Sequence, residues 1–208
     1  MPRLLLCLPL VIIFLNAHAD QVGDGWKLKH ENYGISIYTR PMPDSPIDEM
    51  RVDAVIKAPL SKVQAVLLDH EMRPLWDRLC RYAKKFEAGD SANLLELYYD
   101  FPWPLSDRDV LLRVDISQTE DHGRIEFIAE NEILPLKEGV VRIHHAKTVW
   151  ELYAVNDHST QLRAEAHSEP NGPIPAWLIN KLSVTQPIEN IQALRTLSAT
   201  SSDNGVMP

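Results

Sequence analysis

The sequence predicts a single α+β domain in which one long C-terminal helix covers the inner face of a curved antiparallel sheet. Three observations favour this class. About ten β-type segments fill most of the chain, and several alternate apolar with polar residues, as antiparallel strands with one buried face do. A long apolar helical segment follows the last strand. Because one helix cannot fill the concave face of so many strands, an internal apolar cavity is expected.

Length and composition agree with one ordinary domain. The chain has 208 residues, of which 45% are hydrophobic and 24% are charged, as in a typical globular protein. The 29 acidic residues outnumber the 21 Lys and Arg residues, which gives a formal net charge of −8, and no long basic run is present. Nucleic-acid binding depends on clustered cations, so we expect no nucleic-acid partner.

The N-terminus has the pattern of a secretory signal peptide. Arg3 precedes an apolar run from Leu4 to Leu15, and Ala17-His18-Ala19 forms an A-x-A cleavage site. A helix over this run rises about 18 Å, which is well short of the roughly 30 Å hydrocarbon core of a bilayer. We therefore predict a signal peptide over residues 1–19 rather than an N-terminal anchor. Cleavage before Asp20 would give a periplasmic or secreted protein, and a Gram-negative periplasm is favoured.

Removal of the signal peptide leaves Cys80 as the one cysteine, so the predicted mature chain has no intramolecular disulfide. The residue is either a nucleophile or a small buried residue at the start of a strand. No histidine stands next to it in Arg78-Leu79-Cys80-Arg81, although an activated thiol needs such a base or another source of positive charge. The buried structural role is favoured.

The first part of the domain predicts three strands followed by two short helices. The strands are Trp26–Glu31, Ile35–Arg40 and Glu49–Ile56. Asn32-Tyr33-Gly34 is a hairpin signal between the first two. Pro59 suits the first position of a helix, and the apolar stripe of that helix ends near His70. A second short helix is predicted from Glu71 to Trp76, with Pro74 limiting its length.

A long β region follows, and turn-type sequences divide it into seven strands. The predicted strands are Cys80–Glu87, Asn93–Asp100, Asp109–Gln118, Arg124–Asn131, Val140–His145, Lys147–Val155 and Gln161–Glu169. In the third of them, Val110, Leu112, Val114 and Ile116 share one face, which indicates one buried and one solvated side. The final helix is predicted from Pro175 to Leu197, and residues 198–208 are predicted to form a disordered tail.

Three stretches of the chain follow one another in a distinctive order. They are Asp69–Asp77 (DHEMRPLWD), Pro102–Asp109 (PWPLSDRD) and Glu169–Asn180 (EPNGPIPAWLIN). In this order and spacing they resemble the START family, the lipid-transfer domains related to the steroidogenic acute regulatory protein. The resemblance extends over about Trp26 to Leu197. It implies a helix-grip fold, which is a curved antiparallel sheet wrapped around a long C-terminal helix with a hydrophobic cavity.

The resemblance also implies a function for residues 20–197. Members of this kind bind or carry a lipid or sterol-like molecule in a tunnel under the last helix, without chemistry. We expect no cofactor, and no metal site, because the adjacent His144 and His145 would point to opposite faces of a strand. We further expect a monomer that contacts membranes transiently. The predicted signal peptide is a departure from the family, because many members known for transfer work in the cytosol. This departure leaves the donor and acceptor membranes open.

Seven residues are the candidates for ligand binding, and no catalytic residue is assigned. They are Trp76, Arg108, Trp150, Trp177, Leu178, Leu182 and Ile188. Trp177 and Leu178 lead the set, since they begin the helix that closes the cavity. The other two tryptophans can line the tunnel or pack the core, whereas Trp103, in its Pro-flanked turn, is expected to pack. Arg108 can anchor a ligand headgroup or belong to a salt-bridged turn that fixes a strand.

Two other functions remain open from the sequence. The first is a cyclase- or hydrolase-type enzyme on the same fold, because fold does not determine function. It would need an acid–base pair in the cavity, for example among Arg113, Glu130 and His167. The strand pattern places Arg113 opposite the apolar face, which argues against it. The second is an envelope interaction protein whose own side chains fill the cavity.

Overall fold

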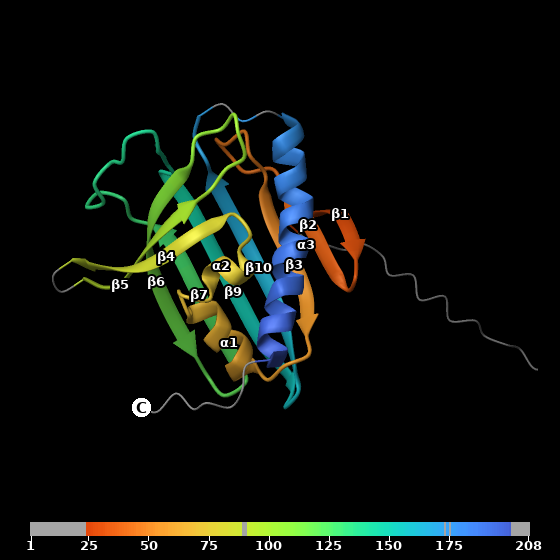
Figure 1. The fold of residues 1–208 in the computed structure, drawn as a ribbon. Coiled ribbons are helices and arrows are strands. Elements are labelled where there is room, and N and C mark those ends of the chain that lie inside the picture. Colours follow the sequence, from red (N-terminus) through yellow and green to blue (C-terminus); the bar gives the residue numbers. More distant parts are fainter. Residues whose placement is uncertain (1–23, 89–90, 173, 175, 201–208) are drawn as a thin grey trace, which may run out of the picture.

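A computed structural model describes residues 24–88, 91–172, 174 and 176–200. It confirms the predicted α+β architecture, with one curved sheet and three helices on its concave side (Figure 1). The strands are β1 (Lys27–Asn32), β2 (Ile35–Arg40), β3 (Glu49–Ile56), β4 (Cys80–Ala88), β5 (Ser91–Tyr99), β6 (Arg108–Gln118), β7 (His122–Ala129), β8 (Val141–Arg142), β9 (His145–Asn156) and β10 (Ser159–Glu169). The helices are α1 (Leu60–Leu68), α2 (Arg73–Trp76) and α3 (Ala176–Thr200). The predicted signal peptide and its cleavage site before Asp20 lie outside the described residues.

The strand order places the last strand, β10, next to β3 from the N-terminal part of the domain. That order is β1-β2-β3-β10-β9-β7-β6-β5-β4, and β8 pairs with β6 in parallel while the other pairs are antiparallel. The chain therefore crosses from β3 to the far edge at β4, and α1 and α2 lie in that crossing. Figure 1 shows α3 running along the open side of the sheet, beside α1 and α2. No helix among the described residues is long and apolar enough to cross a membrane.

The β1–β2 turn fixes the C-terminal part of α3 to the sheet. Tyr33 and Gly34 both have positive φ angles, of 55° and 63°, as a tight hairpin turn requires. This conformation leaves their carbonyl groups free to accept hydrogen bonds from Arg195 of α3, at 2.8 and 3.0 Å. A third bond from Arg195 reaches the carbonyl oxygen of Val55, at 3.1 Å. One guanidinium group thus connects the helix to two parts of the sheet.

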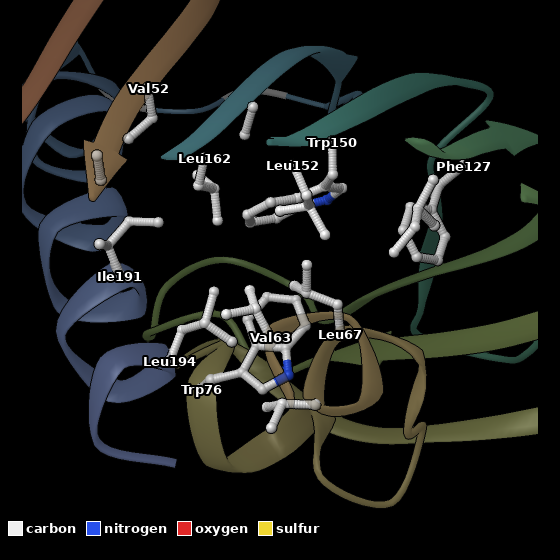
Figure 2. Close-up of a cluster of buried hydrophobic side chains, with 14 of the residues drawn as sticks. Val52, Val63, Leu67, Trp76, Phe127, Trp150, Leu152, Leu162, Ile191 and Leu194 are labelled. Atoms are coloured by element: carbon white, nitrogen blue, oxygen red, sulfur yellow. The ribbon is translucent and has the colours of Figure 1, made fainter. Parts of the chain in front are cut away.

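The core fills only part of the concave space. Figure 2 shows Ile191 and Leu194 of α3 and Val63 of α1 directed toward Leu152 and Leu162 of the sheet. All five side chains are fully buried. This packing occupies the end of the concave face that is covered by α1 and the C-terminal half of α3. The first half of α3 covers a different part of the sheet, where the cavity described below lies.

Two predicted boundaries are corrected. The strand predicted over Val140–His145 is only the two residues of β8. Its Arg142 side chain donates to both carboxylate oxygens of Asp109, at 2.6 and 3.1 Å, so a buried ion pair rather than a long backbone ladder holds the segment. Burial would raise the pKa of Asp109, but hydrogen bonds from Arg142 and Lys137 outweigh it and lower that pKa. Helix α3 extends past the predicted Leu197 to Thr200, and residues 201–208 lie outside the described part.

The buried structural role predicted for Cys80 is confirmed. The residue begins β4, is buried, and its thiol donates to the carbonyl oxygen of Tyr82 at 3.3 Å. Burial, with a further contribution from Asp77, raises the pKa of the thiol to about 12. The reactive thiolate is therefore not populated near neutral pH.

Candidate ligand-binding site

A cavity of about 300 Å³ lies between the concave face of the sheet and α3. Most of its wall is apolar, including Met50, Val52, Val110, Leu112, Ala164 and Ala166. Space remains there because β9 and β10 place short side chains, among them Ala146, opposite the first half of the helix. An apolar cavity of this volume lies at the lower end of the range for ligand sites in proteins.

Two tryptophans meet at the boundary between the cavity and the core. The rings of Trp76 (α2) and Trp150 (β9) are 5.8 Å apart between centroids and nearly perpendicular, with an interplanar angle of 82°. In Figure 2 they approach one another from the helix side and from the sheet side. Both are buried and both line the cavity. Their indole Nε1 atoms are buried and have no hydrogen-bond partner among the described residues.

A buried ion pair forms one polar part of the cavity wall. Arg73 and Asp77 are only 8% and 6% exposed. The Nε atom of Arg73 lies 3.3 Å from Oδ2 of Asp77, and the hydroxyl of Tyr99 donates to the same oxygen at 3.4 Å. Burial raises the pKa of the Asp77 carboxyl, and the neighbouring guanidinium offsets part of that rise. Burial likewise raises the pKa of Tyr99, so its hydroxyl keeps its proton and remains a donor.

The guanidinium group of Arg73 is incompletely satisfied within the described chain. Its Nη1 atom is buried without a hydrogen-bond partner there, while the group lies 4.8 Å from the ring centroid of Trp76. A buried donor without a partner costs about 1–3 kcal/mol, and more when it is charged. Three such donors, on Arg73, Trp76 and Trp150, belong to the lining of one cavity. The residues that carry these donors are therefore close to any ligand that the apolar wall would hold.

The structure brings together three of the seven residues predicted from the sequence. Trp76, Trp150 and Leu182 line the cavity. Leu178 is buried but does not line it, and Ile188 packs against the main core. Trp177 lies in the first turn of α3, and its side chain is outside the described part of the structure. Ligand contact by these residues stays a prediction.

Arg108 is fully buried beside the cavity and does not line it. Its guanidinium donates to the carbonyl oxygens of Ser106, Pro170 and Asn171, and burial lowers its pKa. It thereby joins the β5–β6 loop to the connection that precedes α3. Pro170 itself lines the cavity, so Arg108 holds the cavity wall in place.

Sequence reasoning missed the ion pair of Arg73 and Asp77 and its partner Tyr99. A signal was present, because an arginine and an aspartate four residues apart face the same side of a helix and flank Trp76 in the first of the three motif stretches. The burial of that pair depends on packing of α2 against α3 and β4 and on contacts with Tyr99 of β5 and Phe127 of β7. Most of these partners lie far along the chain. The local sequence therefore does not predict that the pair is buried.

The acid–base residues considered for an enzyme do not line the cavity. Arg113 lies on the opposite face of β6, as predicted, and its Nε atom is 3.0 Å from Oε2 of Glu130. Both residues are about half exposed. The ring of His167 is 3.1 Å from the hydroxyl of Ser45.

The packing role expected for Trp103 is wrong. The residue is 91% exposed. It stands in a turn between Pro102 and Leu105, in which the Leu105 amide donates to the Pro102 carbonyl oxygen at 3.1 Å. The turn presents the indole to solvent, away from the sheet.

Comparison with known proteins decides the family. The family model described as the START domain matches residues 14–199, which is most of the chain. The chain belongs to the START domain family. Its sheet and C-terminal helix form the helix-grip fold that the sequence motifs implied. Membership supports a role in binding a hydrophobic ligand.

Individual relatives agree with this assignment. The crystal structure of a STAR-related lipid transfer protein from Xanthomonas axonopodis is 30% identical, covers 85% of this START chain and 100% of that chain, and has a TM-score of 0.74. An uncharacterized protein of Pseudomonas aeruginosa is 27% identical over 180 residues, which is 85% of this chain and 88% of the relative. START domain-containing protein 10 of human and mouse is 25% identical over 168 residues. That match covers 76% of this chain and 56% of the length of those relatives.

Proposed function

We propose that this protein binds one lipid or sterol-like molecule in the cavity under α3, without chemical conversion. The observation that carries the proposal is an apolar cavity lined by three residues that each carry a buried donor without a partner in the described chain. The printed name of the Xanthomonas relative, a lipid transfer protein, supports the same ligand class. We propose in addition that the bound protein is a monomer.

The proposed mechanism is burial of hydrocarbon together with orientation of one polar end. Each buried CH₂ group contributes about 0.8 kcal/mol to retention of the ligand. Arg73 Nη1 would donate to an oxygen of the ligand, since hydrogen bonds from a charged donor are the stronger kind. The ligand would enter when α3 or a neighbouring loop moves, because the helix covers the cavity.

Filling the cavity from β10 tests this function. Ala166→Trp places an indole into the space that the ligand would occupy, and we expect the affinity for a fluorescent fatty acid or phospholipid to fall at least ten-fold. The matched control is Gln161→Trp, an exposed position on the same strand, which should change the affinity less than two-fold. Fluorescence titration measures the affinity, and circular dichroism checks folding. Equal affinities in both folded variants would contradict the proposal.

We also propose that the Trp103 turn contacts a membrane during loading or release. Tryptophan is the residue that prefers the interface between lipid and water, and this one is almost fully exposed. Phe101, two residues earlier, lines the cavity. The exposed indole therefore lies on a loop that also forms part of the cavity wall.

For Trp103→Ser, we expect the rate of lipid transfer between vesicles to fall at least three-fold, while ligand affinity in solution stays within two-fold. The matched control is Tyr33→Ser, an exposed aromatic at the β1–β2 turn, which should leave the transfer rate unchanged. Transfer is followed by dequenching of a labelled lipid. An unchanged rate for the Trp103 variant would exclude this contact. The predicted signal peptide supports the further proposal that these membranes belong to the cell envelope.

A further inference from the structure

The loop between β7 and β8, residues 130–140, presents two large aliphatic side chains to solvent. Leu136 is 79% exposed and Ile133 is 48% exposed. Among the described residues, only Trp103 is a more exposed large apolar side chain than Leu136. A single exposed apolar residue is ordinary on a protein surface, so the role of Leu136 depends on how the loop is held and on what lies beside it.

The β7–β8 loop is held firmly on both sides of Leu136. Before it, Leu134 is buried in a small apolar cluster with residues of β5 and β6. The buried Arg142 donates to the carbonyl oxygens of Leu134 and Pro135, at 3.0 and 2.9 Å. After it, Lys137 forms ion pairs with carboxylates of β5 and β6, at 2.5 and 3.0 Å. Because the loop is already ordered, it would lose little conformational entropy on binding.

The β7–β8 loop and the β5–β6 loop that carries the Trp103 turn are neighbours. They lead into β8 and β6, which pair in parallel with Arg108 opposite Val141, and the Val141 amide donates to the carbonyl oxygen of Asp107 at 2.8 Å. The hydroxyl of Tyr98 donates to the Asp107 carboxylate at 2.8 Å, and the Lys137 ammonium lies 5.7 Å from the centroid of the same tyrosine ring. Both loops therefore leave the same end of the sheet, which is the upper end in Figure 1.

The charges of the β7–β8 loop favour apolar insertion over attraction to anionic lipids. Lys137 is the one cation in residues 130–140, all of which the structure describes, and it is already ion-paired. Glu132 and Glu138 are exposed, and the chain carries a formal net charge of −8. Attraction to anionic lipids needs clustered basic residues, which this loop lacks. Insertion of apolar side chains into the bilayer surface needs no such cluster.

We infer that the β7–β8 loop is a second membrane-docking element, which inserts Leu136 and Ile133 into a lipid bilayer surface beside the Trp103 turn. Two contact points orient the molecule on the bilayer, whereas one would let it rotate. The cavity wall at Phe101, which belongs to the β5–β6 loop, then faces the membrane. This inference rests on the membrane contact proposed for the Trp103 turn, and it is independent of which ligand the cavity holds.

The test measures binding of the full chain to vesicles of dioleoyl phosphatidylcholine by co-sedimentation. For Leu136→Ser, we expect the affinity for the vesicles to fall at least five-fold, while the affinity for a fluorescent fatty acid in solution stays within two-fold. The matched control is Val155→Ser, which is 56% exposed near the end of β9 that is remote from β8, and it should bind the vesicles within two-fold of wild type. Adding phosphatidylglycerol to the vesicles should change the wild-type affinity less than two-fold.

A second variant, Leu136→Trp, distinguishes a bilayer from a pocket on a protein partner. The bilayer interface favours indole and has no fixed shape, so this variant should bind the vesicles at least as tightly as wild type. The inference is overturned if wild-type protein does not bind the vesicles, if Leu136→Ser binds them like wild type, or if Leu136→Trp loses as much affinity as Leu136→Ser. Loss of fatty-acid binding by the wild-type protein would instead contradict the proposed function and leave the vesicle comparison intact.

Discussion

Replacing Asp77 with alanine is expected to lower the free energy of unfolding by about 3–5 kcal/mol. The change leaves the Arg73 guanidinium buried without its counter-charge, and breaking a buried ion pair from one side costs about that much. Urea denaturation measures the effect. The control is Asp100→Ala, which breaks the exposed pair with Arg81 and should cost less than about 1 kcal/mol. A loss for Asp77→Ala as small as that of the control would show that the pair is not shielded from solvent.

Replacing both Arg73 and Asp77 should distinguish the effect of the ion pair on the free energy of unfolding from its effect on ligand affinity. In Arg73→Met/Asp77→Leu, two apolar side chains fill a buried site that held two charges. Such replacements are often neutral or stabilising by about 1–4 kcal/mol, but the Tyr99 hydroxyl loses its acceptor here, which costs about 1–3 kcal/mol. We therefore expect a smaller loss in the free energy of unfolding than for Asp77→Ala. We expect the affinity for phosphatidylglycerol to fall at least ten-fold, because the donor proposed to hold the ligand oxygen is gone.

The matched control for this double replacement is Arg81→Met/Asp100→Leu on the exposed pair, which should leave the affinity within two-fold of wild type. Titration of a fluorescent phosphatidylglycerol measures all three proteins. A stable Arg73→Met/Asp77→Leu protein with undiminished affinity would show that the buried pair is structural and takes no part in binding.

Alternating residues allowed most of the sheet to be predicted from the sequence. A strand with one buried face repeats every two residues, and Val110, Leu112 and Val114 are buried as expected. Ile116, which was predicted on the same buried face, is 47% exposed, because it lies near the end of β6. The turn before β2 was visible for a different reason, since Asn32 and Gly34 are turn-type residues, and Gly34 has the positive φ angle that glycine allows. The strand predicted around Arg142 was too long. An ion pair between the side chains of Arg142 and Asp109 holds this segment in place of most of the backbone pairing.

The site was only partly predictable, because burial of charge is a tertiary property. Trp76 was found within the first motif stretch, and Trp150 was found as a large aromatic residue on a predicted strand. Arg73 and Asp77 stand in the same motif as Trp76, yet charged residues are usually exposed, so their burial could not be expected. Arg108 was expected as a candidate ligand anchor, and the structure shows its donors occupied by backbone carbonyl groups.

Occupancy of the cavity is tested most directly by native mass spectrometry of the protein purified from an exported pool, with organic extraction of anything bound. We expect a stoichiometric additional mass of a few hundred daltons that is lost on extraction, on a chain that begins at Asp20. Ala166→Trp, purified in the same way, should carry none of it. A wild-type protein that carries no additional mass, even after incubation with mixed lipids, would contradict lipid binding by this cavity.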